Sequence, residues 1–147
     1  MLIGSYIVVM FLDVGTVSFG YASVLDRVSA YPLLLVPAGF LIAFGLYLVK
    51  ESHSAVFAKA EKPEFHDSGV YSIVRHPMYL GGLTILLGFL FLELSLIAFS
   101  IWIIYMVLCD WMASYEEKDL LRVLGNKYAE YQNRVPKWLP FSKKETA

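Results

Sequence analysis

The chain is short and unusually apolar, with 147 residues of which 58% are hydrophobic and only 17% are charged. A soluble domain normally carries about 45–50% apolar and roughly 25% charged residues. The composition therefore predicts a small integral membrane protein with little room for a separate soluble domain. The formal net charge of −1 excludes a basic nucleic-acid surface, and the single cysteine excludes an internal disulfide or dithiol redox pair.

Apolar segments in chain order predict four transmembrane helices. Residues 2–25 form the first predicted span, which Asp13 interrupts, and residues 31–49 form the second. Residues 77–109 hold one charge, Glu93, but a single helix of this length would be about 50 Å long, against about 30 Å for the hydrocarbon core. Two shorter spans, about 77–92 and 94–112, joined as a tight hairpin near Glu93, fit the membrane better.

The two polar segments are a loop at residues 50–76 and a tail at residues 113–147. Eleven of the twelve Lys and Arg residues lie in them, which predicts that both segments and both termini are cytoplasmic. In the tail, apolar residues recur every three or four positions from Leu120 to Val135, interrupted by Gly125. This spacing predicts an amphipathic helix on the membrane surface. The expected fold is a single all-α integral membrane domain with four transmembrane helices and this cytoplasmic helix.

Arg75, His76 and Pro77 stand where the loop enters the third predicted span. Proline suits the first position of a helix and keeps the preceding residue out of helical geometry, so His76 is expected at the helix cap. Free N–H groups at a helix N-terminus attract anions, and Arg75 adds a positive charge. The alternative is that Arg75 and His76 only anchor the helix at the membrane interface.

Glu116 and Glu117 follow the exit of the fourth predicted span. Adjacent acids at such an exit are commonly a solvated face. The predicted topology, however, puts this exit on the same side of the membrane as the His76 cap. A cationic ligand could then lie between Glu116 and His76.

These two segments carry a specific pattern of residues, in the second half of the chain. The first block is Gly69-x-Tyr71-x-x-Val74-Arg75-His76-Pro77-x-Tyr79-x-Gly81; the second comprises Glu116-Glu117, Leu120, Gly125, Tyr128, Tyr131, Val135-Pro136 and Leu139-Pro140. In both blocks the chain resembles the isoprenylcysteine carboxyl methyltransferase family, within the wider group that includes membrane phospholipid methyltransferases.

The resemblance implies that S-adenosylmethionine is bound by membrane helices and the tail. The sequence has no strand followed by a Gly-x-Gly turn, as a Rossmann cofactor site would require. Residues 63–66 match another cofactor-contacting segment in position alone. Carried over residue by residue, the implied cofactor-binding positions are Tyr71, His76, Pro77, Met78, Tyr79 and Glu116.

The methyl acceptor expected from the resemblance is a lipophilic or prenylated molecule that enters from the bilayer. The isoprenylcysteine enzymes place an arginine for the substrate carboxylate one helical turn before the first glutamate, but this chain has Met112 there. The expected reaction is carboxylate O-methylation or a related transfer, with Arg75 and Arg122 as the next candidate cations.

An amine or hydroxyl acceptor would need a general base, and Glu117, Asp110 or His76 could serve. The candidate catalytic residues are His76, Glu117 and Arg75.

Three other functions remain open at this stage. A small four-span proton-coupled transporter could use Asp13 as its carrier, although this leaves the Arg75 to Pro77 block unexplained. A membrane reductase and a non-catalytic member of the family are the others. His53 and His66, with nearby glutamates, show no metal-ligand spacing and are expected in a solvated loop, so no metal site is predicted.

Overall fold

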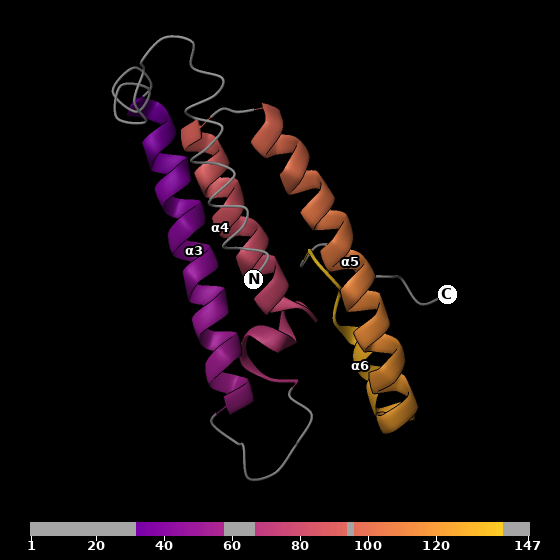
Figure 1. The fold of residues 1–147 in the computed structure, drawn as a ribbon. Coiled ribbons are helices and arrows are strands. Elements are labelled where there is room, and N and C mark those ends of the chain that lie inside the picture. The colour runs from indigo at the N-terminus through magenta and orange to yellow at the C-terminus, as the bar shows by residue number, and fades with distance from the viewer. Residues whose placement is uncertain (1–31, 58–66, 94–95, 140–147) are drawn as a thin grey trace. The chain divides into compact units, whose positions relative to one another are not determined.

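The computed structural model describes residues 32–57, 67–93 and 96–139, and all regular secondary structure in these ranges is helical (Figure 1). The helices are α3 (Pro32–Phe57), α4 (Pro77–Glu93), α5 (Leu96–Leu124) and α6 (Asn126–Arg134), with a short 3-10 helix, η1 (Gly69–Ser72), before α4. The all-helical prediction is thus confirmed for the described part of the chain. The predicted span at residues 2–25, including Asp13, lies outside these ranges.

Two of the described helices are long and apolar enough to cross a membrane, namely Pro32–Ala55 of α3 and Ala98–Leu124 of α5. The segment of 24 residues in α3 corresponds to about 36 Å of helix, which exceeds the roughly 30 Å of a hydrocarbon core. A shorter apolar helix covers Pro77–Leu92. By length and composition, the described part of the chain therefore has the helices of a membrane protein.

The helix boundaries differ from the predicted spans at the ends of α5, which continues to Leu124 past the predicted end at residue 112, and of α3. Helix α3 continues to Phe57, eight residues past the predicted end of the second span at residue 49. The predicted span ends where charged residues begin, because hydropathy indicates which residues lie in the membrane. It does not indicate where the helix itself ends. Residues 50–57 contain no glycine or proline, so nothing in the local sequence stops the helix.

The chain divides into two compact units, and each is described by itself. The first unit comprises, among the described residues, 32–46, 82–93 and 96–107. Its core contains Leu86 and Leu90 from α4 and Ala98 from α5, and the indole N–H of Trp102 donates to the carbonyl of Leu83 at 3.0 Å. This hydrogen bond and the apolar cluster join α4 to α5.

Helix α3 approaches α4 closely in the same unit, as Figure 1 also shows. The contact is at Gly88, where an added Cβ would lie 2.6 Å from Cγ1 of Ile42 and 2.9 Å from the carbonyl oxygen of Ala38. A helix with a side chain at this position could not come so near. Gly88 is therefore what allows the backbones of α3 and α4 to pack together.

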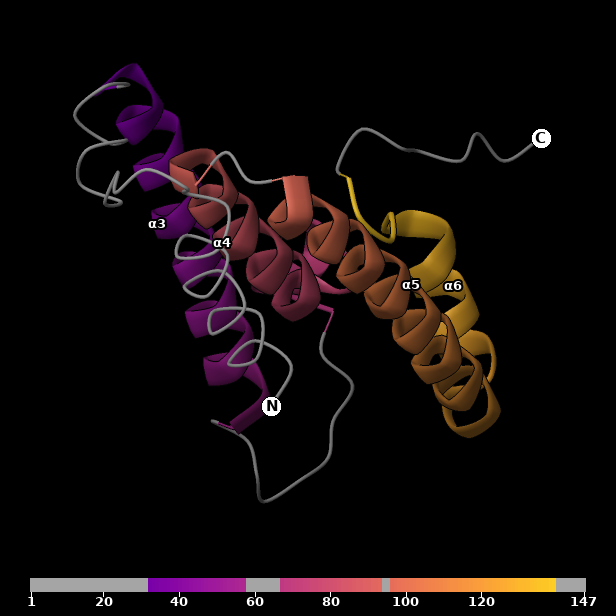
Figure 2. The same cartoon turned by 45° about the horizontal axis from the view of Figure 1, so that its top comes forward.

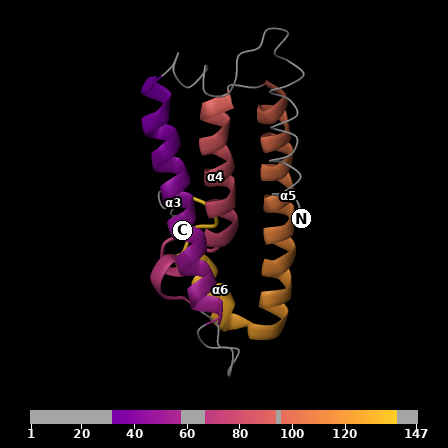
Figure 3. The ribbon, with the colours of Figure 1, turned by 60° about the vertical axis from the view of Figure 1, so that its left-hand side comes forward.

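The second unit comprises, among the described residues, 47–57, 67–81 and 108–139. Here α5 ends at Leu124, and Gly125, with a φ of 55°, turns the chain into α6, which folds back along the end of α5 (Figures 2 and 3). The positive φ is a conformation that glycine adopts without steric cost.

The apolar stripe of the tail has a different partner from the one expected. It was expected on the membrane surface, yet its residues pack against one another across the Gly125 turn. The cluster buries Tyr128, Tyr131 and Val135 against Leu120, Leu121 and Leu124. The tail is thus a folded part of the second unit, because its two helical segments bury the stripe between them.

Candidate functional site

The start of α4 holds the first group of candidate residues. Pro77 is the first residue of α4, and the carbonyl of His76 accepts the first helical hydrogen bond from the N–H of Leu80 at 3.0 Å. His76 is thus the cap of α4, as predicted. The turn of η1, with Gly69 at a φ of 62°, leads the chain into this position.

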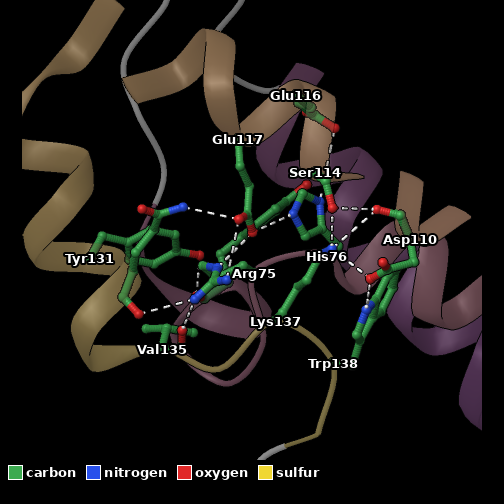
Figure 4. A network of polar contacts seen from close by, with 12 residues as sticks. Arg75, His76, Asp110, Ser114, Glu116, Glu117, Tyr131, Val135, Lys137 and Trp138 are labelled. Carbon is green, nitrogen blue, oxygen red and sulfur yellow. Dashed lines mark hydrogen bonds and ion pairs between the residues drawn. The ribbon is translucent and has the colours of Figure 1, made fainter. Parts of the chain in front are cut away.

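Four of the five side-chain N–H groups of Arg75 donate hydrogen bonds to other parts of the protein (Figure 4). Its Nε and Nη2 donate to the two carboxylate oxygens of Glu117 at 2.8 and 3.3 Å. Its Nη1 donates to the carbonyls of Gln132 and Val135 at 3.0 and 2.8 Å, and its backbone N–H donates to the carbonyl of Pro136 at 3.0 Å. Arg75 therefore ties the start of α4 to both α5 and the end of α6.

Glu117 is buried at the centre of this network, with a side chain only 12% exposed. Its Oε1 also lies 3.0 Å from Nε2 of His76, and its Oε2 accepts a hydrogen bond from Nε2 of Gln132 at 2.9 Å. The two oxygens thus have four donors, which is the number of lone pairs that a carboxylate offers. This satisfaction is what allows a charge to be buried here.

His76 is enclosed by aromatic rings as well as by this carboxylate. Its side chain is 5% exposed, and the rings of Tyr79 and Trp138 each lie with their centroids 5.8 Å from the imidazole. Nδ1 of His76 lies 3.9 Å from Oε2 of Glu116 (Figure 4). The two ring nitrogens thus face two different glutamates, one buried and one accessible.

Glu116 is the accessible member of the acidic pair, with a side chain 51% exposed. Met78 is also exposed, and Tyr79 is partly so. These side chains and the first turn of α4 therefore form an accessible edge beside the buried network.

A strap at the end of the tail, defined here as residues 135–139, crosses to α5 on the other side of His76. Nζ of Lys137 donates to Ser114 Oγ at 2.7 Å and to the carboxylate of Asp110, and Nε1 of Trp138 donates to the same carboxylate at 2.8 Å. The strap is thereby held where the Trp138 ring covers His76 (Figure 4).

Tyrosines attach η1 to the tail. The hydroxyl of Tyr131 donates to the carbonyl of Tyr71 at 2.7 Å. Burial raises the pKa of both Tyr128 and Tyr131 above the ordinary tyrosine value, and for Tyr131 the nearby Tyr128 adds to the rise. Burial also raises the pKa of Tyr71, against the opposing effect of a hydrogen bond with Ser52. All three phenols therefore stay neutral at physiological pH.

The structure brings together most of the residues that the sequence singled out. Tyr71, Arg75, His76, Pro77, Met78, Tyr79, Glu116 and Glu117 all belong to the second unit. Residues 63–66, the remaining segment predicted to contact the cofactor, lie outside the described residues. Arg122 does not join the network, because it is exposed and pairs with Asp119 at 3.0 Å.

Sequence reasoning missed Gln132 and the role of the strap. Gln132 contacts both Glu117 and Arg75, but a lone glutamine in a polar helix gives no signal of its own. The ring of Trp138 lies against His76, a contact that no pattern in the sequence indicates. The spacing of Asp110 and Lys137, 27 residues apart, predicts no contact between them. Among the described residues no group of three or more His, Cys, Asp or Glu side chains could hold a metal ion.

These features define a class of protein: a helical membrane protein whose polar site is assembled from a helix N-terminus, the end of an apolar helix and a folded tail. A family model described as phospholipid methyltransferase matches residues 32–127, which covers both the Arg75 to Pro77 block and the Glu116–Glu117 pair. The chain belongs to the phospholipid methyltransferase family.

Individual relatives carry methyltransferase names. The methanethiol S-methyltransferase of Pseudomonas deceptionensis is 35% identical over 109 residues, which are 73% of this chain and 41% of that protein. The protein-S-isoprenylcysteine O-methyltransferase B of Arabidopsis thaliana is 33% identical over 61% of this chain and 46% of the relative. The corresponding Saccharomyces cerevisiae enzyme is 30% identical over 90% of this chain and 56% of the relative.

The chain spans about half the length of the curated relatives that it matches. No solved structure matches it. The alternative of a proton-coupled transporter that uses Asp13 finds no support among these relatives, and Asp13 lies outside the described residues.

Proposed function

We propose that the chain is an integral membrane methyltransferase that transfers a methyl group from S-adenosylmethionine to a lipophilic acceptor at the cytoplasmic face. The observation that carries this proposal is the network of Arg75, His76 and Glu117, three residues that all lie within the range matched by the family model. A network that only stabilised a helix end would not require an accessible carboxylate and an open helix N-terminus beside it.

The residues at this edge fit the chemical groups of S-adenosylmethionine. Among the described residues nothing accepts a hydrogen bond from the N–H groups of Met78 or Tyr79 in the first turn of α4. These groups suit the carboxylate of the cofactor's methionine part, because a helix N-terminus favours an anion. The half-exposed carboxylate of Glu116 suits its ammonium or hydroxyl groups. Tyr71, His76 and Pro77 complete the proposed cofactor-binding set.

The cofactor supplies an activated methyl group on a sulfonium. The protein must then align the acceptor with that methyl group and keep water away. Tyr79 and Trp138 supply apolar surface around His76, and the strap holds Trp138 in place. Glu117 is unsuited to contact the sulfonium, because its four acceptor positions are already filled by the protein.

The proposed acceptor is uncharged before the reaction, and a lipophilic thiol is favoured over a carboxylate. A carboxylate acceptor needs a cation beside it, yet Met112 is apolar, Arg75 is bound to Glu117 and Arg122 pairs with Asp119. The name methanethiol S-methyltransferase, carried by relatives from Pseudomonas deceptionensis and Crocosphaera subtropica, supports a thiol. A prenylated carboxylate, as in the names of the Arabidopsis and yeast relatives, is the second candidate.

The proposed topology has four spans, at residues 2–25, α3, α4 and α5, with both termini in the cytoplasm. The asymmetry of Lys and Arg supports it, since eleven of twelve lie in residues 50–76 and 113–147. Cofactor would then reach the site from the cytosol, and the acceptor from the bilayer.

The experiment that tests this proposal combines binding with transfer. Purified protein in lipid nanodiscs is titrated with S-adenosylmethionine by calorimetry, then supplied with methyl-labelled cofactor and either dodecanethiol or N-acetyl-S-farnesylcysteine. Saturable binding and label in the thioether are expected.

Glu116→Ala should weaken binding about tenfold or more, as for a lost charged contact. Glu130→Ala, at an exposed position of α6, is the matched control. Absence of saturable binding by the wild type would refute the proposal, and label in the farnesylcysteine ester alone would replace the thiol with the carboxylate.

A further inference from the structure

The hydrogen-bond pattern around Glu117 determines which nitrogen of His76 carries a proton. Arg75 and Gln132 donate to Glu117, so its carboxylate is ionised and only accepts. Nε2 of His76, 3.0 Å from Oε1 of the same carboxylate, must therefore be the donor in that contact. In the neutral ring the proton is on Nε2, and Nδ1 keeps a free lone pair.

Nδ1 of His76 is a buried basic atom without a hydrogen-bond partner among the described residues. Oε2 of Glu116 lies 3.9 Å from this nitrogen, which is too far for a hydrogen bond. The side chain is 95% buried and lies between the rings of Tyr79 and Trp138. A buried basic nitrogen of this kind is suited to accept a proton from a bound molecule.

The other titratable groups around His76 are engaged or exposed. Arg75 and Glu117 neutralise one another, and Asp110 is held by Lys137 and Trp138. Glu116 is half exposed to water. Among the three bases considered from the sequence, His76 is the one with a buried, unused acceptor atom beside the accessible edge, because the four acceptor positions of Glu117 are filled and Asp110 is 55% exposed to water.

We infer that His76 is the general base of the proposed methyl transfer, with Glu117 and Arg75 as positioning residues that fix its tautomer. This inference rests on the proposed function. As the methyl group is transferred, the S–H bond of the thiol acceptor breaks and its sulfur forms the new S–CH3 bond. The sulfonium C–S bond breaks with its electron pair left on the departing sulfide. The proton goes to Nδ1 of His76, and from there through Glu116 to water.

Glu117 then stabilises the imidazolium that results. It lies 3.0 Å from Nε2, and Glu116 lies on the other side of the ring, so the protonated ring faces two carboxylates. The same logic operates where a carboxylate orients a catalytic histidine without taking its proton. Arg75 acts indirectly, because its two hydrogen bonds hold the Glu117 carboxylate in the orientation that His76 requires.

The decisive variant is His76→Gln, which can still donate an amide N–H to Glu117 but has no basic nitrogen. We expect its affinity for S-adenosylmethionine, measured by calorimetry, to fall by no more than about tenfold, because one contact of the cofactor-binding set is lost while the α4 N–H groups remain, and transfer is therefore compared at saturating cofactor. With an alkanethiol at pH 7, methyl transfer should fall about 100-fold or more, the usual contribution of a general base. The rate should then rise about tenfold per pH unit toward the pKa of the thiol, since hydroxide-generated thiolate replaces the base.

The acidity of the acceptor separates a lost base from a damaged fold. An aromatic thiol of similar size is far more acidic and is already ionised at neutral pH, so His76→Gln should methylate it at nearly the wild-type rate. His53→Gln, at an exposed position of α3, is the matched control and should resemble the wild type with both thiols. Equal losses with both thiols and parallel pH profiles would show that His76 is structural, and would overturn the inference.

A spectroscopic readout tests the tautomer without any turnover. The protein has three histidines, so 15N-histidine labelling gives few signals, and the one lost in His76→Gln belongs to His76. A neutral ring protonated at Nε2 is expected, shifting toward a tautomer mixture in Glu117→Gln. A ring protonated at Nδ1 would overturn the inference. Failure of the wild type to bind S-adenosylmethionine would instead refute the proposed function.

Discussion

At the scale of single residues, Arg75 shows how one side chain can unite segments that are far apart in the sequence. Four of its side-chain N–H groups have partners, on Glu117, Gln132 and Val135, which lie 42 to 60 residues away. The guanidinium has a planar fork of five donors, and a lysine could not make these contacts together. Arg75 is therefore better suited to organise the site than to bind an acceptor.

The stability of the second unit should depend strongly on this residue. Arg75→Met leaves Glu117 buried without its cation, a change that costs about 3–5 kcal/mol of the free energy of unfolding. Arg122→Met is the matched control, because Arg122 is 76% exposed in its pair with Asp119 and should cost only about 0.5 kcal/mol or less. Denaturant unfolding in detergent, followed by circular dichroism, measures both. Similar values for the two variants would contradict a structural role for Arg75.

The sequence predicted the residues of the site better than it predicted their roles. Arg75, His76 and the two glutamates stand out through their pattern, but Glu116 and Glu117 are neighbours on a helix and point about 100° apart. Only the fold shows that Glu117 faces the buried network and Glu116 faces water. Gln132 could not be found at all, because its part depends on the turn at Gly125.

At the scale of secondary structure elements, the close approach of α3 and α4 depends on the absence of one side chain. Gly88 lies where a Cβ would meet Ile42 and the backbone of Ala38. In a membrane no hydrophobic driving force brings helices together, so helix packing relies on such close backbone contacts. The glycine thus has a packing role in the first unit.

Gly88→Ala should therefore destabilise the first unit by about 1–3 kcal/mol, the usual cost of overpacking. Gly39→Ala is the matched control on α3, since an added Cβ there meets nothing within 4 Å. That change should be neutral or stabilise the protein by up to about 1 kcal/mol, because alanine favours a helix over glycine. Thermal unfolding in the same detergent compares the two. A Gly88→Ala variant as stable as Gly39→Ala would refute the close contact.

The bounds of a helix were predictable where the composition of the sequence and the tendency to form a helix indicate the same residues. The start of α4 at Pro77 followed from proline geometry, and the separate helices α4 and α5 followed from length. The end of α3 and the course of the tail did not follow, for different reasons. Helix α3 continues past the end of its apolar segment. For the tail, an amphipathic stripe in a sequence does not indicate whether the stripe faces lipid or protein.

At the scale of the whole molecule, the distribution of Lys and Arg determines the expected orientation. Lysines and arginines are concentrated in residues 50–76 and 113–147, while the segment around Glu93 has none. Such an excess is retained on the cytoplasmic side during insertion. The proposed site at His76 and Glu116 would then be on the side where S-adenosylmethionine is present.

Cysteine labelling of this chain tests the orientation. In a Cys109→Ser background, which removes the only cysteine, Ser95→Cys should react with an impermeant maleimide added to intact cells. Lys144→Cys should react only after the membrane is opened. The two variants control for one another in expression and reactivity. Labelling of Lys144→Cys in intact cells would place the tail outside and contradict the proposed topology.

The contacts between Arg75 and the tail have a consequence for variation within the family. Arg75 donates to the carbonyls of Gln132, Val135 and Pro136, which are main-chain groups. Every amino acid has such a carbonyl, so this part of the connection constrains the path of the tail and leaves its side chains free to change. The side chains of the tail could therefore change during evolution while its backbone path stays the same. Such changes would alter the residues that cover the site and leave the hydrogen bonds of Arg75 to the main chain unchanged.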